Sequence, residues 1–322
     1  MRFRKSLIAC VSVLIAVALG SCAPDNAAVD DDKISIVCTS FPGYDFVRQL
    51  THGIDGVEFS MLLKPGSESH SYEPTPQDII SVKNCDMFVY VGGESDEWAK
   101  NILGSVDTDH MKIIALIDCV DLVEEEIVEG MDAKEEHSSD EHLYEPEYDE
   151  HVWTSPVNSI EIVRRISEAL CSILSENDKS ICENNTETFI SQLSELDSEF
   201  KAVADGGARK VIVFGDRFPF RYFADEYGLE YYAAFPGCSS ETEASAKTVS
   251  FLIDMIKSEN IPVVFYPELS NKKIAETICE STNAKAMQMN SCHNVTSDEF
   301  ESGVTYISLM KQNVEALKYA LN

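Results

Sequence analysis

Short apolar runs alternate with amphipathic segments along most of this chain. Runs such as residues 86–91 have the length and composition of buried strands. The segment 76–83 is typical of a helix, because Thr75 can cap its first turn and Pro76 suits the first helical position. Strands that alternate with helices predict βαβ units and parallel sheets. The predicted strands are residues 34–39, 57–63, 86–91, 112–117, 210–214, 229–233, 262–266 and 285–289, and the predicted helices are residues 42–52, 76–83, 95–103, 156–174, 177–205, 218–227, 241–259, 271–281 and 298–321.

One predicted helix, residues 177–205, is much longer than the others. Its apolar residues recur at helical spacing and keep a single stripe, and Gly206 and Gly207 end it. A helix of about 28 residues extends about 42 Å, which is long enough to connect two lobes. The stripe consists of Ile181, Phe189, Leu193, Leu196, Phe200 and Val203.

The pattern therefore predicts an α/β fold with two lobes, each a parallel β-sheet flanked by helices, joined by one long rigid helix. The predicted boundaries are 33–176 for the N-terminal lobe, 177–206 for the linking helix and 207–322 for the C-terminal lobe. Ligands of parallel α/β sheets bind beyond the carboxyl ends of the strands. In this arrangement that edge faces the cleft between the lobes.

The N-terminus has the pattern of a secretory signal peptide. Arg2, Arg4 and Lys5 precede the apolar residues 7–19, and small residues then lead to Cys22. The position of Cys22 resembles a bacterial lipobox, so we expect its lipidation and an extracytoplasmic chain anchored to the cell membrane by lipid. The predicted boundaries are 1–21 for the signal peptide and 22–32 for a lipid-anchored tether.

The charge balance is strongly acidic, with 25 Lys and Arg against 56 Asp and Glu. Removing the signal peptide deletes three bases and no acids, which moves the net charge from −31 to −34. Such a chain repels nucleic acid, and a cation is the more plausible partner.

Residues 124–150 contain many carboxylates and little apolar material, so this segment is too polar to fold by itself. We interpret it as a mobile surface loop. Its His137 and His142 are either auxiliary zinc-capturing ligands or part of an inert solvated segment.

Ten cysteines are many for this length, but no Cys-x-x-Cys pair occurs, which argues against a structural zinc knuckle. Cys238 and Cys292 each follow a predicted strand of the C-terminal lobe, so a disulfide between them is a hypothesis.

Two motifs, each with a histidine near an aromatic residue, suggest a metal site built from distant loops. Residues 65–76 read Pro-Gly-Ser-Glu-Ser-His-Ser-Tyr-Glu-Pro-Thr-Pro and contain His70, and residues 150–156 read Glu-His-Val-Trp-Thr-Ser-Pro and contain His151. Imidazole suits Zn²⁺, Mn²⁺ and Fe²⁺ at neutral pH. Glu73 can orient the His70 ring, and Trp153 is expected to pack rather than to take part in chemistry.

These motifs resemble those of the metal-binding lipoproteins of bacterial ABC importers for zinc and manganese, and the acidic loop before the second motif is typical of the zinc-importing branch. The likeness covers nearly the whole chain after the signal peptide. It implies two lobes bridged by a rigid helix, with His70 and His151 as ligands of an ion bound between the lobes.

The C-terminal half of the expected site departs from the family pattern. The family has a His or Glu in a His-x-x-Phe-like context after the first strand of this lobe, where Gly215 stands here beside Asp216. The family's Asp or Glu after the last strand is replaced by residues 290–294, which include His293, the lobe's single histidine. We therefore predict His293 as third ligand and Asp216 as fourth. The alternatives for the fourth position are Cys292, Cys238, Glu268 and a water.

Three imidazoles suit zinc better than manganese. We expect a monomeric, non-enzymatic receptor that captures Zn²⁺ and passes it to the membrane permease of an ABC importer. Alternatives are a manganese or iron receptor, a metal buffer or a cell-adhesion protein with the same site, and a secreted zinc hydrolase with Glu73, Asp216 or Glu268 as base. The hydrolase is the weakest, because no His-Glu-x-x-His or Gly-x-Ser-x-Gly motif occurs.

Overall fold

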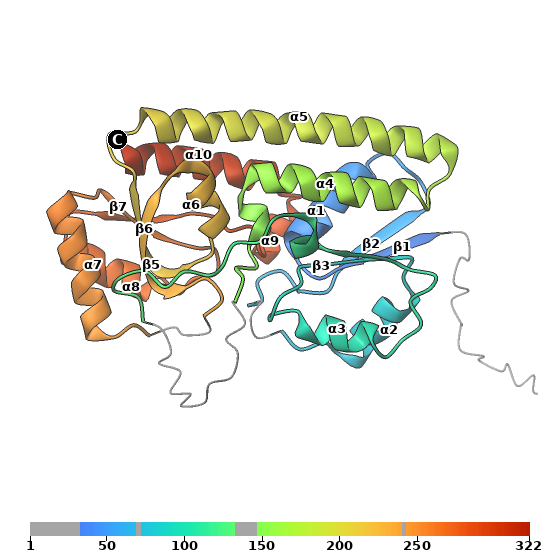
Figure 1. Ribbon diagram of the computed structural model, residues 1–322, viewed down its shortest axis with the longest axis horizontal. Coiled ribbons are helices and arrows are strands. Elements are labelled where there is room, and N and C mark those ends of the chain that lie inside the picture. The colour runs from blue at the N-terminus through green and yellow to red at the C-terminus, as the bar shows by residue number, and fades with distance from the viewer. Residues whose placement is uncertain (1–32, 69–71, 133–146, 240–242) are drawn as a thin grey trace, which may run out of the picture. The chain divides into compact units, whose positions relative to one another are not determined.

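Two four-stranded parallel sheets organise the part of the chain that the computed structural model describes, residues 33–68, 72–132, 147–239 and 243–322 (Figure 1). Their strand orders are β2-β1-β3-β4 and β6-β5-β7-β8, so the second sheet repeats the order of the first. The predicted fold class is confirmed. The strands are β1 (Ile34–Cys38), β2 (Val57–Met61), β3 (Met87–Tyr90), β4 (Lys112–Ala115), β5 (Val211–Phe218), β6 (Glu230–Pro236), β7 (Val263–Tyr266) and β8 (Lys285–Gln288).

Helices follow the strands much as the sequence pattern indicates. Thr75 caps its helix with a capping box to Asp78, as expected from the Thr-Pro opening. The helices are α1 (Phe41–Leu50), α2 (Pro76–Asn84), α3 (Glu97–Leu103), α4 (Pro156–Cys171), α5 (Glu176–Gly206), α6 (Arg221–Tyr227), α7 (Ala246–Glu259), α8 (Lys273–Glu280), α9 (Ser297–Glu301) and α10 (Tyr306–Leu321), with short 3₁₀ turns at Leu116–Cys119 and Val152–Thr154.

One hydrophobic core is shared by the two sheets. Ile36 of β1 and Phe214 of β5 both face it, and they are buried there with side chains from α1, α4, α5, α6 and α10. Val37 follows Ile36 in β1, and Val213 precedes Phe214 in β5. These two residues face separate small cores under the outer helices. This alternation follows from the two-residue period of a strand. Figure 1 shows α5 and α10 running across the second sheet and α5 and α4 reaching the first.

The long helix α5 is continuous over 31 residues and begins at the N-cap Ser175. Four of the six predicted stripe residues, Phe189, Leu193, Leu196 and Phe200, are buried as expected. Val203 is partly buried against the same core, whereas Ile181 is 38% exposed. Cys182, Thr186 and Ala204 are also buried along the helix.

The predicted terminal helix, residues 298–321, is wrong in one respect, because it is divided into α9 and α10. Gly303 has φ of 76°, a left-handed conformation that interrupts a right-handed helix. Thr305 then caps α10 through a capping box with Ser308.

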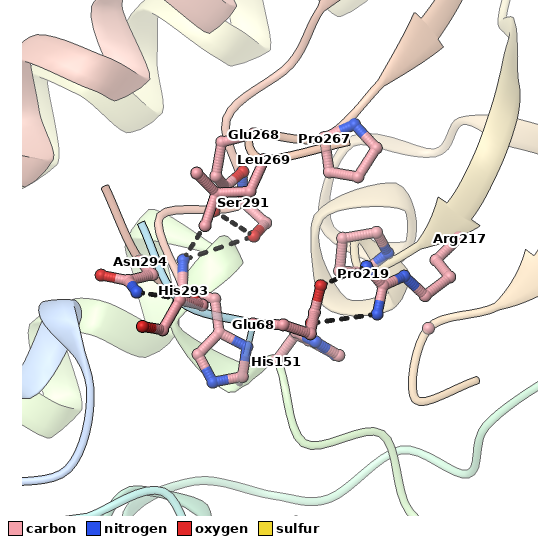
Figure 2. A pocket seen from close by; sticks show the side chains of 12 residues that line it. Glu68, His151, Arg217, Pro219, Pro267, Glu268, Leu269, Ser291, His293 and Asn294 are labelled. Atoms are coloured by element: carbon pink, nitrogen blue, oxygen red, sulfur yellow. Dashed lines mark hydrogen bonds and ion pairs between the residues drawn. The ribbon is translucent and has the colours of Figure 1, made fainter. Parts of the chain in front are cut away.

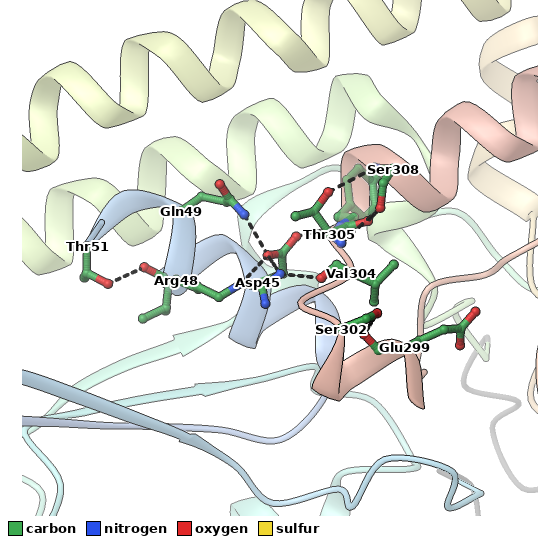
Figure 3. Close-up of polar contacts among 11 residues, drawn as sticks. Asp45, Arg48, Gln49, Thr51, Glu299, Ser302, Val304, Thr305 and Ser308 are labelled. Carbon is green, nitrogen blue, oxygen red and sulfur yellow. Dashed lines mark hydrogen bonds and ion pairs between the residues drawn. The ribbon is translucent and has the colours of Figure 1, made fainter. Parts of the chain in front are cut away.

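A buried carboxylate connects α1 to the start of α10 (Figure 3). Asp45 Oδ1 accepts from Arg48 Nε at 2.9 Å and from Gln49 Nε2 at 2.9 Å, and its Oδ2 accepts from the Tyr306 backbone N–H at 2.6 Å. Arg48 also donates to the carbonyl of Val304. The contact satisfies an N–H at the first turn of α10 and joins the two lobes.

The end of β5 and the start of α6 also differ from the predictions. Strand β5 continues to Phe218 with a bulge between Phe214 and Arg217, and α6 begins only at Arg221. Phe218 precedes Pro219, which disfavours helical backbone at Phe218.

The acidic segment 124–150 is not a free surface loop at its ends. Glu124 pairs with Tyr148 in an antiparallel bridge, and Asp149 and Glu150 are buried. The middle of the segment lies outside the described residues.

No helix in the described part of the chain is both long enough and apolar enough to cross a membrane. The predicted signal peptide, tether and Cys22 lie outside the described residues.

The buried carboxyl group of Asp96 gives a testable pH dependence. It accepts from the N–H of Val91 at 2.7 Å and from Thr39 Oγ1 at 3.2 Å, and burial raises its pKa from 3.8 to about 6. A carboxyl whose pKa is raised on folding contributes its full stability below pH 4 and loses it as pH rises through 6. The loss is about 3 kcal/mol.

We therefore expect Asp96→Asn to remove this loss. The unfolding free energy of the variant minus that of the wild type should rise by about 3 kcal/mol between pH 4 and pH 7 in urea titrations. Parallel curves for the two proteins would contradict this account.

Candidate metal site

A small cavity lies beyond the carboxyl ends of the second sheet (Figure 2). Its volume is about 40 Å³, which is an order of magnitude below the roughly 300–1,000 Å³ of pockets for organic ligands. The size suits an ion with one or two waters. The cavity is lined by Ser67, Glu68, His151, Arg217, Pro219, Gly237, Pro267, Glu268, Leu269, Ser291, His293 and Asn294.

His151 is held from behind by a carboxylate. Asp149 Oδ1 accepts from the His151 backbone N–H at 2.8 Å and lies 3.1 Å from its Nδ1. Both residues are buried. With Nδ1–H donating to the carboxylate, the lone pair of Nε2 is left for a metal, as in carboxylate–histidine–zinc arrangements.

Acidic groups surround this histidine. Burial by itself lowers the pKa of the His151 imidazole, but the carboxylates of Asp149, Glu150 and Glu125 outweigh burial and raise that pKa above its usual value. The same negative field favours a bound cation.

His293 lies in a tight turn after β8 that Glu268 holds in place. Glu268 Oε1 accepts from the His293 N–H at 2.9 Å and from Ser291 Oγ at 2.7 Å, while Oε2 accepts from the Ser291 N–H at 2.6 Å. Cys292, between them, has φ of 61°, an uncommon conformation for a residue with a side chain. The Phe41 N–H donates to the His293 carbonyl at 3.2 Å, which ties the turn to α1.

Trp153 brings the two histidines together. Its ring centroid lies 5.0 Å from that of His293 and 5.6 Å from that of His151, and the two imidazoles are 5.5 Å apart. Trp153 Nε1 donates to the Ser291 carbonyl at 2.7 Å, so the tryptophan fixes both histidine segments by packing and by a hydrogen bond.

Of the residues near the end of β5, Arg217 lines the cavity, and Gly215 and Asp216 are not among its lining residues. A Cβ on Gly215 would lie 2.6 Å from the Ala275 backbone, so Gly215 allows α8 to pack closely on β5. Arg217 lines the cavity, and with Phe220 it fits the same three-residue spacing as Gly215 with Phe218.

Asp216 does not line the described cavity. Its Oδ1 accepts from the Arg217 N–H at 2.8 Å, and Ser270 Oγ donates to its Oδ2. These bonds connect β5 to the loop before α8.

The alternatives for the fourth ligand differ in their surroundings. Cys238 and Cys292 are both free thiols, so the hypothetical disulfide is not formed. Burial raises the pKa of each of the two thiols well above its usual value, which disfavours the thiolate that a metal requires. The Glu268 carboxylate is engaged by the His293 turn, and Glu73 is exposed and away from the described cavity lining.

The described ranges contain no group of three or more His, Cys, Asp or Glu side chains that could hold a metal ion. The structure brings His151 and His293 together in one cavity wall. The predicted ligand His70 and the loop residues His137 and His142 lie outside the described residues.

Sequence reasoning missed Asp149, Glu68 and Arg217. Asp149 was detectable, because it lies directly before the His151 motif. Its carboxylate is the kind of group that commonly orients a metal-binding imidazole. Arg217 was hidden by the β5 bulge, which shifts the side chain that reaches the cavity by one residue relative to a regular strand.

Because Glu268 holds the His293 turn by hydrogen bonds, we expect it to contribute to the stability of the protein without metal. Glu268→Gln leaves one oxygen acceptor for three donors, so the metal-free protein should lose about 1–3 kcal/mol of unfolding free energy in urea titrations. The exposed Glu276→Gln on α8 is the matched control and should change little. If Glu268→Gln lowered zinc affinity but left metal-free stability intact, Glu268 would be a ligand instead.

Comparisons with known proteins identify a family for this chain. Residues 36–320 match the family described as zinc-uptake complex component A, periplasmic (ZnuA). The chain is 30% identical over 315 residues to the high-affinity zinc uptake system protein ZnuA of Bacillus subtilis (strain 168), covering 98% of this chain and 96% of that protein.

The chain is also 30% identical over 317 residues to the zinc-binding lipoprotein AdcA of Streptococcus pneumoniae (strain ATCC BAA-255 / R6), where the match covers 98% of this chain but only 60% of AdcA. The crystal structure of the Zn(II)-bound ZnuA-like domain of Streptococcus pneumoniae AdcA has a TM-score of 0.72 at 27% identity, covering 90% of this chain and 99% of that one. The chain therefore belongs to the family of the periplasmic zinc-uptake component A.

Proposed function

We propose that this protein is an extracytoplasmic receptor that captures Zn²⁺ between its lobes and delivers it to an ABC-type importer. The observation that carries the proposal is the pair of buried imidazoles, His151 and His293, facing one ion-sized cavity with a carboxylate behind His151. The zinc-uptake family and the zinc-binding relatives support the same cargo.

His151 and His293 are the proposed ligands within the described residues, and His70 is the third. Three imidazoles and one water complete a tetrahedral zinc site without Asp216, whose oxygens are already bonded. The role of the chain's own groups is to bind and orient. Asp149 fixes the His151 tautomer, Glu268 fixes the His293 turn, and the bound ion undergoes no reaction.

We also propose that residues 1–21 act as signal peptide and 22–32 as tether, with Cys22 carrying the lipid. The lobes are residues 33–176 and 207–322, and the linking helix is 177–206. The mature chain acts as a monomer.

Two alternatives fare less well on physical grounds. A zinc hydrolase needs room for an organic substrate beside the metal, and a cavity of about 40 Å³ leaves none. A manganese or iron receptor would favour more oxygen ligands than this wall leaves available, because Glu268 is engaged by backbone groups and Glu68 is paired with Arg217.

Metal selectivity tests the proposal directly. The mature protein, stripped of metal and re-equilibrated with an equimolar Zn/Mn/Fe mixture, should retain about one zinc per chain by elemental analysis. His151→Ala and His293→Ala should each weaken zinc binding by more than ~100-fold, since even changes behind a ligand cost about 10–100-fold.

The exposed His110→Ala is the matched control and should bind zinc as the wild type does. Retention of manganese, or zinc binding that is indifferent to both cavity histidines, would contradict the proposal.

Proton competition gives a second test. A metal-bound imidazole must be neutral, and the pKa of His151 is raised, so protons compete with zinc from a pH above the ordinary value of about 6.5. Zinc affinity measured by chelator competition should fall steadily from pH 7.5 to pH 5. An affinity that stays flat over this range would point to carboxylate ligands instead.

A further inference from the structure

A bidentate ion pair joins the two lobes at the wall of the cavity (Figure 2). Arg217 Nη2 lies 2.9 Å from Glu68 Oε2, and Nη1 lies 3.1 Å from Oε1. Arg217 belongs to β5 of the second sheet, whereas Glu68 belongs to the segment after β2 of the first. Their side chains are 13% and 42% exposed, so the contact is partly shielded from solvent.

Arg217 is fixed on its own lobe before it meets Glu68. Its Nη1 also donates to the Ser239 carbonyl at 3.4 Å, and its Nε lies 3.8 Å from Asp216 Oδ1. These contacts hold the planar guanidinium in a defined orientation, which is the requirement for two parallel bonds to one carboxylate.

The segment 64–68 has neutral contacts to the same lobe. Asn294 Nδ2 donates to the carbonyls of Lys64 at 2.9 Å and Ser67 at 2.8 Å, and the Gly66 N–H donates to the Val295 carbonyl at 2.7 Å. Asn294 and Val295 follow His293 directly. These hydrogen bonds hold the segment 64–68 against the turn that carries His293. The ion pair with Arg217 lies at the end of the segment, at Glu68.

Because the two sheets share one core, an ion is expected to enter and leave the cavity past the segment 64–68. Ile36 and Phe214 of the two sheets face the same core with α5, so wide separation of the lobes would expose a continuous apolar interior. An ion can then leave with least disruption by local displacement of surface segments. Separation of Glu68 from Arg217 breaks only a partly exposed contact.

We propose that Arg217 is a positioning residue that retains the metal, by holding the segment 64–68 against the His293 turn over the cavity. This inference rests on the proposed function, because it concerns the lifetime of the captured ion. Arg217 cannot bind a metal itself, since its guanidinium stays protonated. Its pairing with Glu68 also offsets the positive charge that would otherwise face the cargo.

The opposite effect follows if the guanidinium acts only through its charge. An unpaired cation beside the cavity repels Zn²⁺, so its removal would slow release. The fastening role predicts faster release. The sign of the change in the dissociation rate of Arg217→Ala therefore separates the two roles.

The test is the rate at which the zinc-loaded mature protein releases its ion to excess chelator in a stopped-flow measurement. Arg217→Ala and Glu68→Gln should each accelerate release by about fivefold, equivalent to ~1 kcal/mol, and the double variant should be no faster than either single one. Arg217→Lys keeps the charge but lacks the planar fork, so it should accelerate release as well.

Arg221→Ala is the matched control, because Arg221 is similarly shielded but pairs with Asp225 and Glu126 outside this cavity. It should release zinc at the wild-type rate. Metal-free unfolding of all variants, followed in urea, confirms that they fold. If Arg217→Ala does not fold, Arg217→Lys tests the same contact with the positive charge kept, because the fastening role predicts faster release and a role through charge alone predicts an unchanged rate.

Unchanged or slower release in Glu68→Gln and Arg217→Ala, or effects that add in the double variant, would overturn the inference. A wild-type protein that binds no zinc, or binds it equally well after His151→Ala, would instead overturn the proposed function. The two failures are therefore distinguishable.

Discussion

The shared hydrophobic core along α5 is the constraint on which the rest of the molecule depends. Both sheets direct one face into it, and the buried stripe of α5 supplies a continuous surface between them. Breaking the core would expose apolar side chains from both lobes at once. The lobes are therefore held at a fixed spacing, and the cavity at the ends of the strands is preformed rather than created by closure.

On this frame, polar contacts place the two histidines. Asp149 orients His151 from one side, while Glu268 imposes an uncommon backbone conformation on the turn that carries His293. Trp153 lies against both rings. None of these groups needs to touch an ion, yet each holds an imidazole of the proposed zinc site in place.

Most of the fold could be predicted from the sequence, because each βα unit carries its own period and caps. The break before α10 and the extension of β5 could not, since they depend on Gly303 and on a bulge fixed by tertiary packing. His151 and His293 were predicted as ligands from motif and position, and the structure places both at the cavity. Arg217 was not, because the register beyond a bulge is invisible to strand periodicity.

Zinc-edge X-ray absorption of the zinc-loaded mature protein would show whether imidazoles from both lobes hold a bound zinc. We expect a first shell of nitrogen and oxygen at about 2.0–2.1 Å with the outer-shell signature of imidazole rings, diminished in His293→Ala. A sulfur shell at about 2.3 Å, or an absence of imidazole scattering, would contradict this expectation.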